Sequence, residues 1–161
     1  MEPDKDKRRI ALAVIGVAVG IAVIIVAYGI FRGSDVGPGV GWIRVGTMQQ
    51  LDEARVTFVA SIPAYVVATP DGFIGLYAKS TQLGEPVEYC ASSGYFEDQM
   101  HGSKFDGVGD YAIGPAPRGL DRLQIRTVGN DVWVYPEDLL LGAPRGTPRP
   151  SPPSGPFCVT G

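Results

Sequence analysis

The chain has 161 residues, which is room for one soluble domain of ordinary size. Its 14 Lys and Arg residues against 17 Asp and Glu residues give a formal net charge of −3. Without a basic excess to neutralise phosphates, nucleic-acid binding is excluded as a main function. One histidine and two cysteines cannot alone complete a usual four-ligand zinc or iron–sulfur site.

Residues 10–31 are a run of 22 residues without a charge, which predicts a single transmembrane helix. A helix of that length reaches about 33 Å, enough for a hydrocarbon core of roughly 30 Å. The alternative is a cleaved secretory signal, whose apolar core is usually shorter. Four basic side chains lie in residues 1–9 and only Arg32 follows closely. The positive-inside rule therefore predicts a single-pass plasma-membrane protein with a cytoplasmic N-terminus and an extracytoplasmic domain.

After the predicted anchor, residues 32–41 are rich in glycine and predict a flexible linker. Residues 42–142 then show short runs rich in β-branched and aromatic residues, separated by turn signals such as Thr69-Pro70-Asp71-Gly72. No 12-residue window there has convincing helical periodicity, so we expect an antiparallel all-β domain. The predicted strands are residues 56–60, 64–68, 73–77, 123–128 and 132–135.

Residues 143–161 form a proline-rich C-terminal tail, with six prolines between residues 144 and 156. Such a segment cannot form a core and is expected to be extended or polyproline-like. The tail nevertheless ends in an apolar tip that contains Phe157 and Cys158. Two interpretations stay open: the tip docks on the domain, or it is disordered as many termini are.

The loop-rich middle of the chain carries the most unusual sequence. Its motifs are Ser80-Thr81-Gln82-Leu83-Gly84, His101-Gly102-Ser103-Lys104-Phe105-Asp106 and the proline loop Gly114-Pro115-Ala116-Pro117. Together they resemble the Rieske iron–sulfur domain family, in which a C-T-H-L-G-C box precedes a C-P-C-H-G-S box and a G-P-A-P loop. The resemblance covers about residues 42–138. It implies a Rieske-like antiparallel β-sandwich on a single N-terminal transmembrane helix.

The ligand positions depart from the family pattern. In the family, two cysteine thiolates and two histidine imidazoles hold a [2Fe–2S] cluster. The resemblance places Ser80, Gln82 and Asp98 at three ligand positions and leaves His101 at the fourth. Glu85 and Met100 stand where the family has the two cysteines that staple its loops. Hard oxygen donors suit an iron–sulfide core poorly, so we expect no cofactor and no metal ligand.

Other interpretations of this region stay open. A single metal ion could use Asp98, His101 and also Cys90, or His101 could be a surface imidazole hydrogen-bonded to the backbone. The carboxylates of Glu85, Glu88, Glu97 and Asp98 could form a general acid–base pair, but we interpret them as solvated loop charges.

Cys90 and Cys158 are the only cysteines, and both are expected in an oxidising compartment. A disulfide between them would stabilise the fold by about 4 kcal/mol under the chain-entropy model. The alternative is two unpaired thiols, one of them on a free tail.

The leading hypothesis is a non-catalytic, membrane-anchored Rieske-like accessory subunit, partnered with other subunits of a respiratory electron-transfer complex. One alternative is a functional [2Fe–2S] electron-transfer subunit of a quinol oxidoreductase. A third hypothesis is an extracytoplasmic module that binds a small ligand or a metal.

Overall fold

The computed structural model describes residues 14–26 and 37–159, and the chain divides into two units, Met1–Val36 and Gly37–Gly161. Residues 14–26 are helical. Within the described residues, no helix combines the length and the apolar character needed to cross a membrane. The predicted anchor at residues 10–31 and its flanks lie partly outside the described residues, so the transmembrane part of the fold prediction is not supported here. Gly37–Gly161 is called the head unit below.

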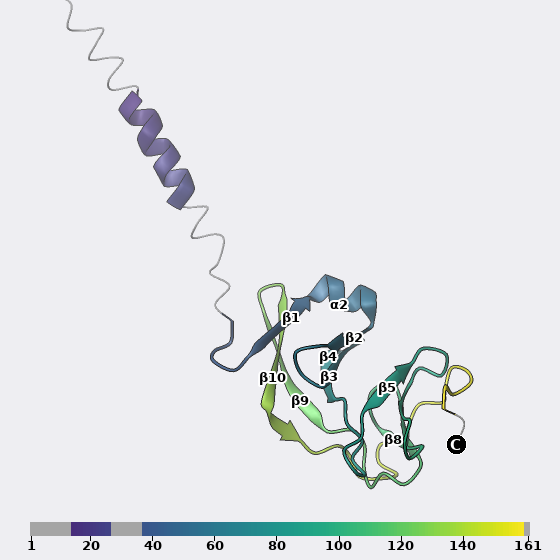
Figure 1. Cartoon of the computed structure of the whole chain (residues 1–161). Helices are drawn as coiled ribbons and strands as arrows, with labels where there is room; N and C mark the ends of the chain where they lie inside the picture. Colours follow the sequence, from purple (N-terminus) through teal and green to yellow (C-terminus); the bar gives the residue numbers. More distant parts are fainter. Residues whose placement is uncertain (1–13, 27–36, 160–161) are drawn as a thin grey trace, which may run out of the picture. The chain divides into compact units, whose positions relative to one another are not determined.

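The head unit consists of two antiparallel sheets, as Figure 1 shows. The six-stranded sheet has the order β1-β10-β9-β4-β3-β2, and the four-stranded sheet has the order β5-β6-β7-β8. The strands of the larger sheet are β1 (Ile43–Thr47), β2 (Val56–Val59), β3 (Ala64–Thr69), β4 (Gly72–Tyr77), β9 (Arg122–Val128) and β10 (Asp131–Leu140). Those of the smaller sheet are β5 (Val87–Cys90), β6 (Tyr95–Asp98), β7 (Lys104–Phe105) and β8 (Tyr111–Ile113). The predicted β architecture is confirmed.

The hairpin of β3 and β4 forms where the turn signal predicts it. Thr69 pairs with Gly72 across the turn, and Gly72 has a φ of 125° that suits glycine. The Thr69 hydroxyl donates to the Gly72 carbonyl at 3.0 Å, which closes the turn. Local turn chemistry therefore sets the register of the central strand pair.

One helix in the head unit was not predicted. Helix α2 (Met48–Ala54) begins with a capping box, in which the Thr47 hydroxyl accepts from the Gln50 amide and the Gln50 side chain accepts from the Thr47 amide. It buries Leu51 against the larger sheet. With only seven residues, this helix is shorter than any window in which helical periodicity can be read.

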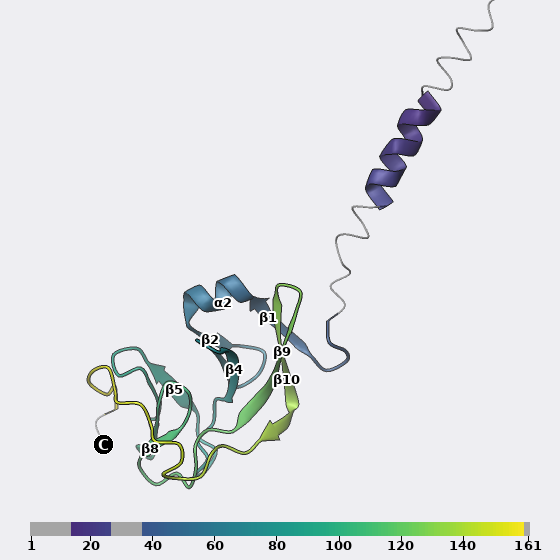
Figure 2. The same ribbon diagram turned by 180° about the vertical axis from the view of Figure 1, so that it is seen from behind.

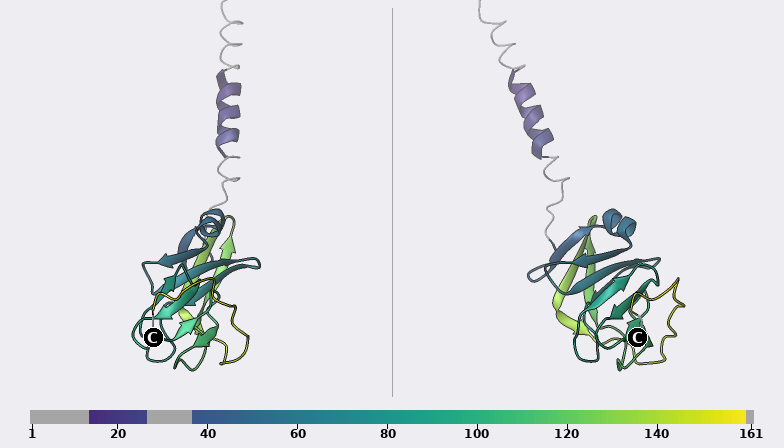
Figure 3. Two further views of the ribbon diagram at one scale, coloured as in Figure 1. Left: turned by 90° about the vertical axis from the view of Figure 1, so that its right-hand side faces the viewer. Right: turned by 45° about the vertical axis from the view of Figure 1, so that its right-hand side comes forward.

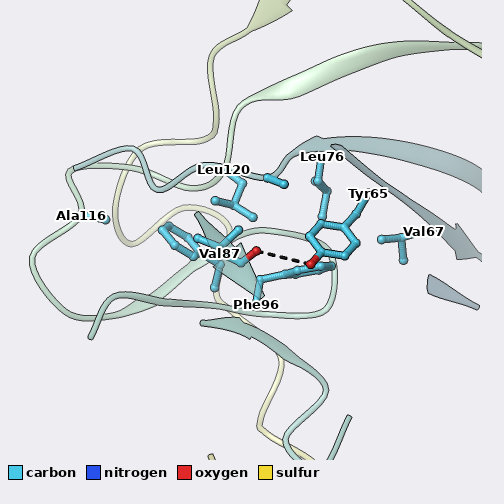
Figure 4. Packing of buried hydrophobic residues seen from close by; sticks show 9 residues of the cluster. Tyr65, Val67, Leu76, Val87, Phe96, Ala116 and Leu120 are labelled. Carbon is cyan, nitrogen blue, oxygen red and sulfur yellow. Dashed lines mark hydrogen bonds between the residues drawn. The ribbon is translucent and has the colours of Figure 1, made fainter. Parts of the chain in front are cut away.

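Strand β3 lies between two cores because its successive side chains point to opposite faces. Tyr65 and Val67 pack with Phe96 in the core that joins the two sheets, as Figure 4 shows. Ala64 and Val66 pack on the other face with residues of β9, β10 and α2. The buried Tyr65 hydroxyl donates to the Val87 carbonyl at 3.4 Å, which links β3 to β5.

The C-terminal tail lies along the four-stranded sheet, and Figures 2 and 3 show this from further sides. A disulfide joins Cys90, at the end of β5, to Cys158 in the tail. The predicted disulfide is confirmed. Of the two interpretations of the tail, the structure shows the docked one.

Asp110 directly precedes β8 and interacts with the acidic Asp106 and the basic Arg122. Its pKa is raised, mainly by burial and further by the Asp106 carboxylate, while the Arg122 guanidinium 3.3 Å away opposes the rise. Ionisation of Asp110 therefore opposes folding. An unperturbed aspartate has a pKa of 3.8, and the pKa of folded Asp110 is higher. The free energy of unfolding that Asp110 contributes therefore falls as the pH rises from the lower pKa through the higher one.

For Asp110→Asn, we expect the free energy of unfolding relative to wild type to increase as the pH rises across that window. The amide cannot ionise, so the variant lacks the pH-dependent cost. Urea unfolding of both proteins at several pH values measures the difference. A difference that stays constant with pH would contradict this account of the carboxyl group.

Candidate functional site

The first loop of the candidate site, residues 80–85, is a tight turn between β4 and β5. The Ser80 amide donates to the Glu85 carbonyl at 2.7 Å, and the Gly84 amide donates to the Ser80 carbonyl at 2.9 Å. Ser80 is buried, whereas Leu83 is exposed at the tip. Backbone hydrogen bonds within residues 80–85 therefore close this turn.

The second loop, residues 98–103, is organised by a buried carboxylate. Asp98 Oδ1 accepts hydrogen bonds from the Met100 and His101 amides, both at 3.0 Å. The Asp98 amide also donates to the Ser103 carbonyl at 2.8 Å. A short side chain that accepts from amides two and three residues later is a local turn motif. Asp98 therefore shapes the loop at the position that the resemblance gives to a cysteine ligand.

The proline loop, residues 114–117, contacts both other loops or their flanks. The Ala116 amide donates to the Ser103 hydroxyl at 3.1 Å, and the Thr81 hydroxyl donates to the Arg118 carbonyl at 2.8 Å. A Cβ atom on Gly114 would lie 2.6 Å from the Ser103 Cα atom, so the close approach requires glycine there. The three predicted loop motifs are thus brought together in space.

The tail holds the outer side of the proline loop through one arginine. Arg145 Nε donates to the Ala116 carbonyl at 2.6 Å, and a second guanidinium nitrogen donates to the Gly114 carbonyl. The guanidinium also lies 4.3 Å from the centroid of the Tyr111 ring. Nothing in the sequence pattern singled out Arg145, because its partners are backbone carbonyls about 30 residues away.

We expect Arg145→Ala to lower the free energy of unfolding of the head unit by about 1–2 kcal/mol, since two charge-assisted hydrogen bonds are lost. Amide exchange in residues 111–118 should also become faster. Hydrogen-exchange mass spectrometry measures this, with exposed Arg149→Ala in the same tail as the matched control. Equal exchange in the two variants would contradict the role given to Arg145.

Three buried polar atoms at the two candidate loops have no hydrogen-bond partner. They are Gln82 Oε1, Asp98 Oδ2 and His101 Nδ1. Asp98 Oδ2 and His101 Nδ1 are 3.6 Å apart. His101 is only partly exposed, and its Nδ1 atom faces the carboxylate rather than solvent. The neighbour of Nδ1 is therefore a carboxylate and not a backbone carbonyl.

Two of the four carboxylates interpreted as solvated loop charges are in fact buried. Glu97 is 1% exposed and Asp98 is 0% exposed. Glu97 accepts hydrogen bonds from the Ser93 hydroxyl at 2.9 Å and from the Cys158 and Val159 amides at 3.2 and 2.7 Å. Because two of the three partners of Glu97 lie in the tail, about 60 residues away, strand alternation alone could not identify them.

Glu97 also lies close to the two cysteine sulfurs, so Cys90, Glu97 and Cys158 form a cluster with the spacing of a metal site. The sulfurs are joined in a disulfide, which removes the thiolates that a metal would need. The cluster therefore serves to fasten the tail.

Comparisons with known proteins find iron–sulfur subunits, although no family model matches the chain. The chain is 28% identical over 141 residues to the chloroplastic cytochrome b6-f complex iron-sulfur subunit of Volvox carteri, a match that covers 73% of this chain and 67% of that protein. It is 36% identical over 87 residues to the cytochrome b6-f complex iron-sulfur subunit of Synechococcus elongatus, covering 52% and 48%. Apart from the Volvox match, the chain spans about half the length of such curated relatives.

Among solved structures, the soluble domain of the Rieske protein II of Sulfolobus acidocaldarius matches with a TM-score of 0.50 at 15% identity. That match covers 74% of this chain and 89% of that domain. At this identity the likeness concerns the fold alone. It agrees with the two-sheet architecture described above.

These comparisons contradict the prediction that the chain has no cofactor. The curated relatives are named as iron–sulfur subunits, and the family carries a [2Fe–2S] cluster. The residues of this chain nevertheless supply a hydroxyl (Ser80), an amide (Gln82), a carboxylate (Asp98) and one imidazole (His101). That set does not fit the two thiolates and two imidazoles that hold the cluster.

Proposed function

Because the chain belongs to the Rieske iron–sulfur domain family, we propose that it is a subunit of a membrane-bound electron-transfer complex of the quinol oxidoreductase type, with a structural or accessory role. In this proposal residues 10–31 anchor it in the plasma membrane and the head unit lies on the extracytoplasmic side. Its partners are other subunits of the complex.

The accessory role is supported by the hydrogen bonds of the two candidate loops and by the residues at their ligand positions. Backbone hydrogen bonds, the Asp98 turn and the contacts from Arg145 all contribute to the geometry of these loops. In this proposal the loops present a defined docking surface, although three of the four donors differ in chemistry from the family pattern. A subunit that docks through this surface can work as a scaffold.

The confirmed disulfide supports the proposed side of the membrane. Disulfides persist in oxidising compartments such as the periplasm or the cell exterior. The Cys90–Cys158 bond joins residues that are 68 positions apart in the sequence. An extracytoplasmic head unit is the location that suits this bond.

Gentle detergent solubilisation of native membranes, followed by capture of the tagged full chain and mass spectrometry of co-eluting proteins, tests the proposal. We expect the other subunits of a quinol-oxidising complex to co-elute in constant ratio. As the control, the head unit alone, without residues 1–36, should be lost from the membrane fraction. Recovery of the full chain without such subunits would contradict the proposal.

A second candidate function is electron transfer by the head unit itself, which the names of the curated relatives favour. That function requires two irons per chain and a paramagnetic signal on reduction. Iron analysis and low-temperature electron paramagnetic resonance of the same preparation distinguish the candidates. Two irons with a Rieske-type signal would establish the second function and overturn the first.

A further inference from the structure

We propose that the two candidate loops bind one divalent transition-metal ion, with Asp98 Oδ2 and His101 Nδ1 as ligands. Such a site differs from the family cluster in both nuclearity and donor chemistry. It does not depend on the accessory role proposed above.

The first support is the distribution of unsatisfied polar atoms. Within the described residues, four buried side-chain nitrogen or oxygen atoms have no hydrogen-bond partner, and three of them belong to these two loops. Buried polar atoms are normally paired, because an unpaired one loses its hydration without compensation. A bound cation would satisfy a buried carboxylate oxygen and a neighbouring imidazole nitrogen that lack hydrogen-bond partners.

The second support is the fixed orientation of the Asp98 carboxylate. Its Oδ1 atom is occupied by the Met100 and His101 amides, and the side chain is fully buried. The free oxygen, Oδ2, is therefore held toward the imidazole rather than toward solvent. Carboxylates that ligate metals are themselves held by such hydrogen bonds to the other oxygen.

The third support is the separation between the two atoms. Asp98 Oδ2 and His101 Nδ1 are 3.6 Å apart, longer than a hydrogen bond. Two ligands that each lie about 2.0–2.1 Å from a tetrahedral ion are separated by about 3.3–3.4 Å. A small adjustment thus places a metal ion between them.

The donor chemistry selects the class of ion. One imidazole and one carboxylate suit Zn²⁺, Co²⁺ or a similar borderline ion. The remaining coordination positions would be open to water, as one position is in catalytic zinc sites. The cysteines do not compete, since both are in the disulfide.

The experiment uses the oxidised full chain in detergent, without a histidine tag and after treatment with a chelator. Co²⁺ is titrated and followed by its visible absorption, and Zn²⁺ is then titrated by calorimetry. His101 is the only histidine, so any imidazole-dependent signal reports this site. We expect one ion per chain, with affinity at least tenfold weaker in His101→Ala and in Asp98→Asn.

Asp52→Asn makes the same chemical change on an exposed carboxylate of α2 and should bind like wild type. Circular dichroism verifies folding, and His101→Ala carries the test if Asp98→Asn does not fold. Binding that is absent, or equal in wild type and His101→Ala, would overturn the proposal and indicate a simple hydrogen bond between the two side chains. A preparation in which these loops hold a [2Fe–2S] cluster would also overturn it.

Discussion

Replacing both cysteines, in the variant Cys90→Ser/Cys158→Ser, should lower the free energy of unfolding of the head unit by about 4 kcal/mol. The disulfide closes a separation of 68 residues, and a loop of that size restricts the unfolded chain strongly. Urea unfolding of wild type and variant measures the loss. Wild type unfolded under reducing conditions should show the same loss, because it lacks the same bond.

The local consequence of losing the disulfide is release of the tail tip. Phe157 packs edge-on against Tyr95 with ring centroids 5.5 Å apart, and Lys104 Nζ lies 5.0 Å from the Phe157 ring. These contacts are individually weak, so without the bond residues 154–159 should become open to limited proteolysis. A variant that keeps both its stability and its resistant tail would contradict the fastening role of the disulfide.

The second large effect is expected for Glu97→Gln, which should cost about 2–3 kcal/mol. The carboxylate accepts from the Cys158 and Val159 amides on different oxygens. A glutamine amide would turn an NH₂ group toward one of these donors and leave it unsatisfied in a buried place. Urea unfolding of the head unit at neutral pH provides the measurement.

Glu88→Gln is the matched control for this prediction, because Glu88 pairs with Glu97 across β5 and β6 but is exposed. It should change the free energy of unfolding by no more than about 0.5 kcal/mol. Combining Glu97→Gln with the double serine variant should cost less than the sum of the two losses, because both changes release the same segment. Full additivity would show that Glu97 acts elsewhere.

Much of the fold could be predicted because its signals are local. The β3–β4 hairpin follows from a proline–glycine turn between β-branched runs, and β9 and β10 follow from alternation around a glycine turn. Helix α2 was not predicted, because its seven residues, which begin with a capping box, are too few to show a periodic pattern. A short capped helix can be predicted only when its capping residues are considered together with its tertiary contacts.

The sequence predicted which loops form the candidate site, but not which side chains there are buried or what they contact. The motifs identified the loops around Ser80, Asp98 and Gly114, and the structure brings these loops together. The burial of Glu97 and the carbonyl contacts of Arg145 come from pairing with the tail across long sequence separations. Such pairs have no periodic signature, because they join segments that are far apart in the sequence.

The most direct test of the account is quinol oxidation by the purified complex that contains the His101→Ala variant of this chain. His101 occupies the one ligand position that keeps its family residue, so an electron carrier would depend on it. An accessory subunit predicts an assembled complex with unchanged turnover, while deletion of the whole chain lowers the amount of assembled complex. A fully assembled His101→Ala complex that no longer oxidises quinol would contradict the account.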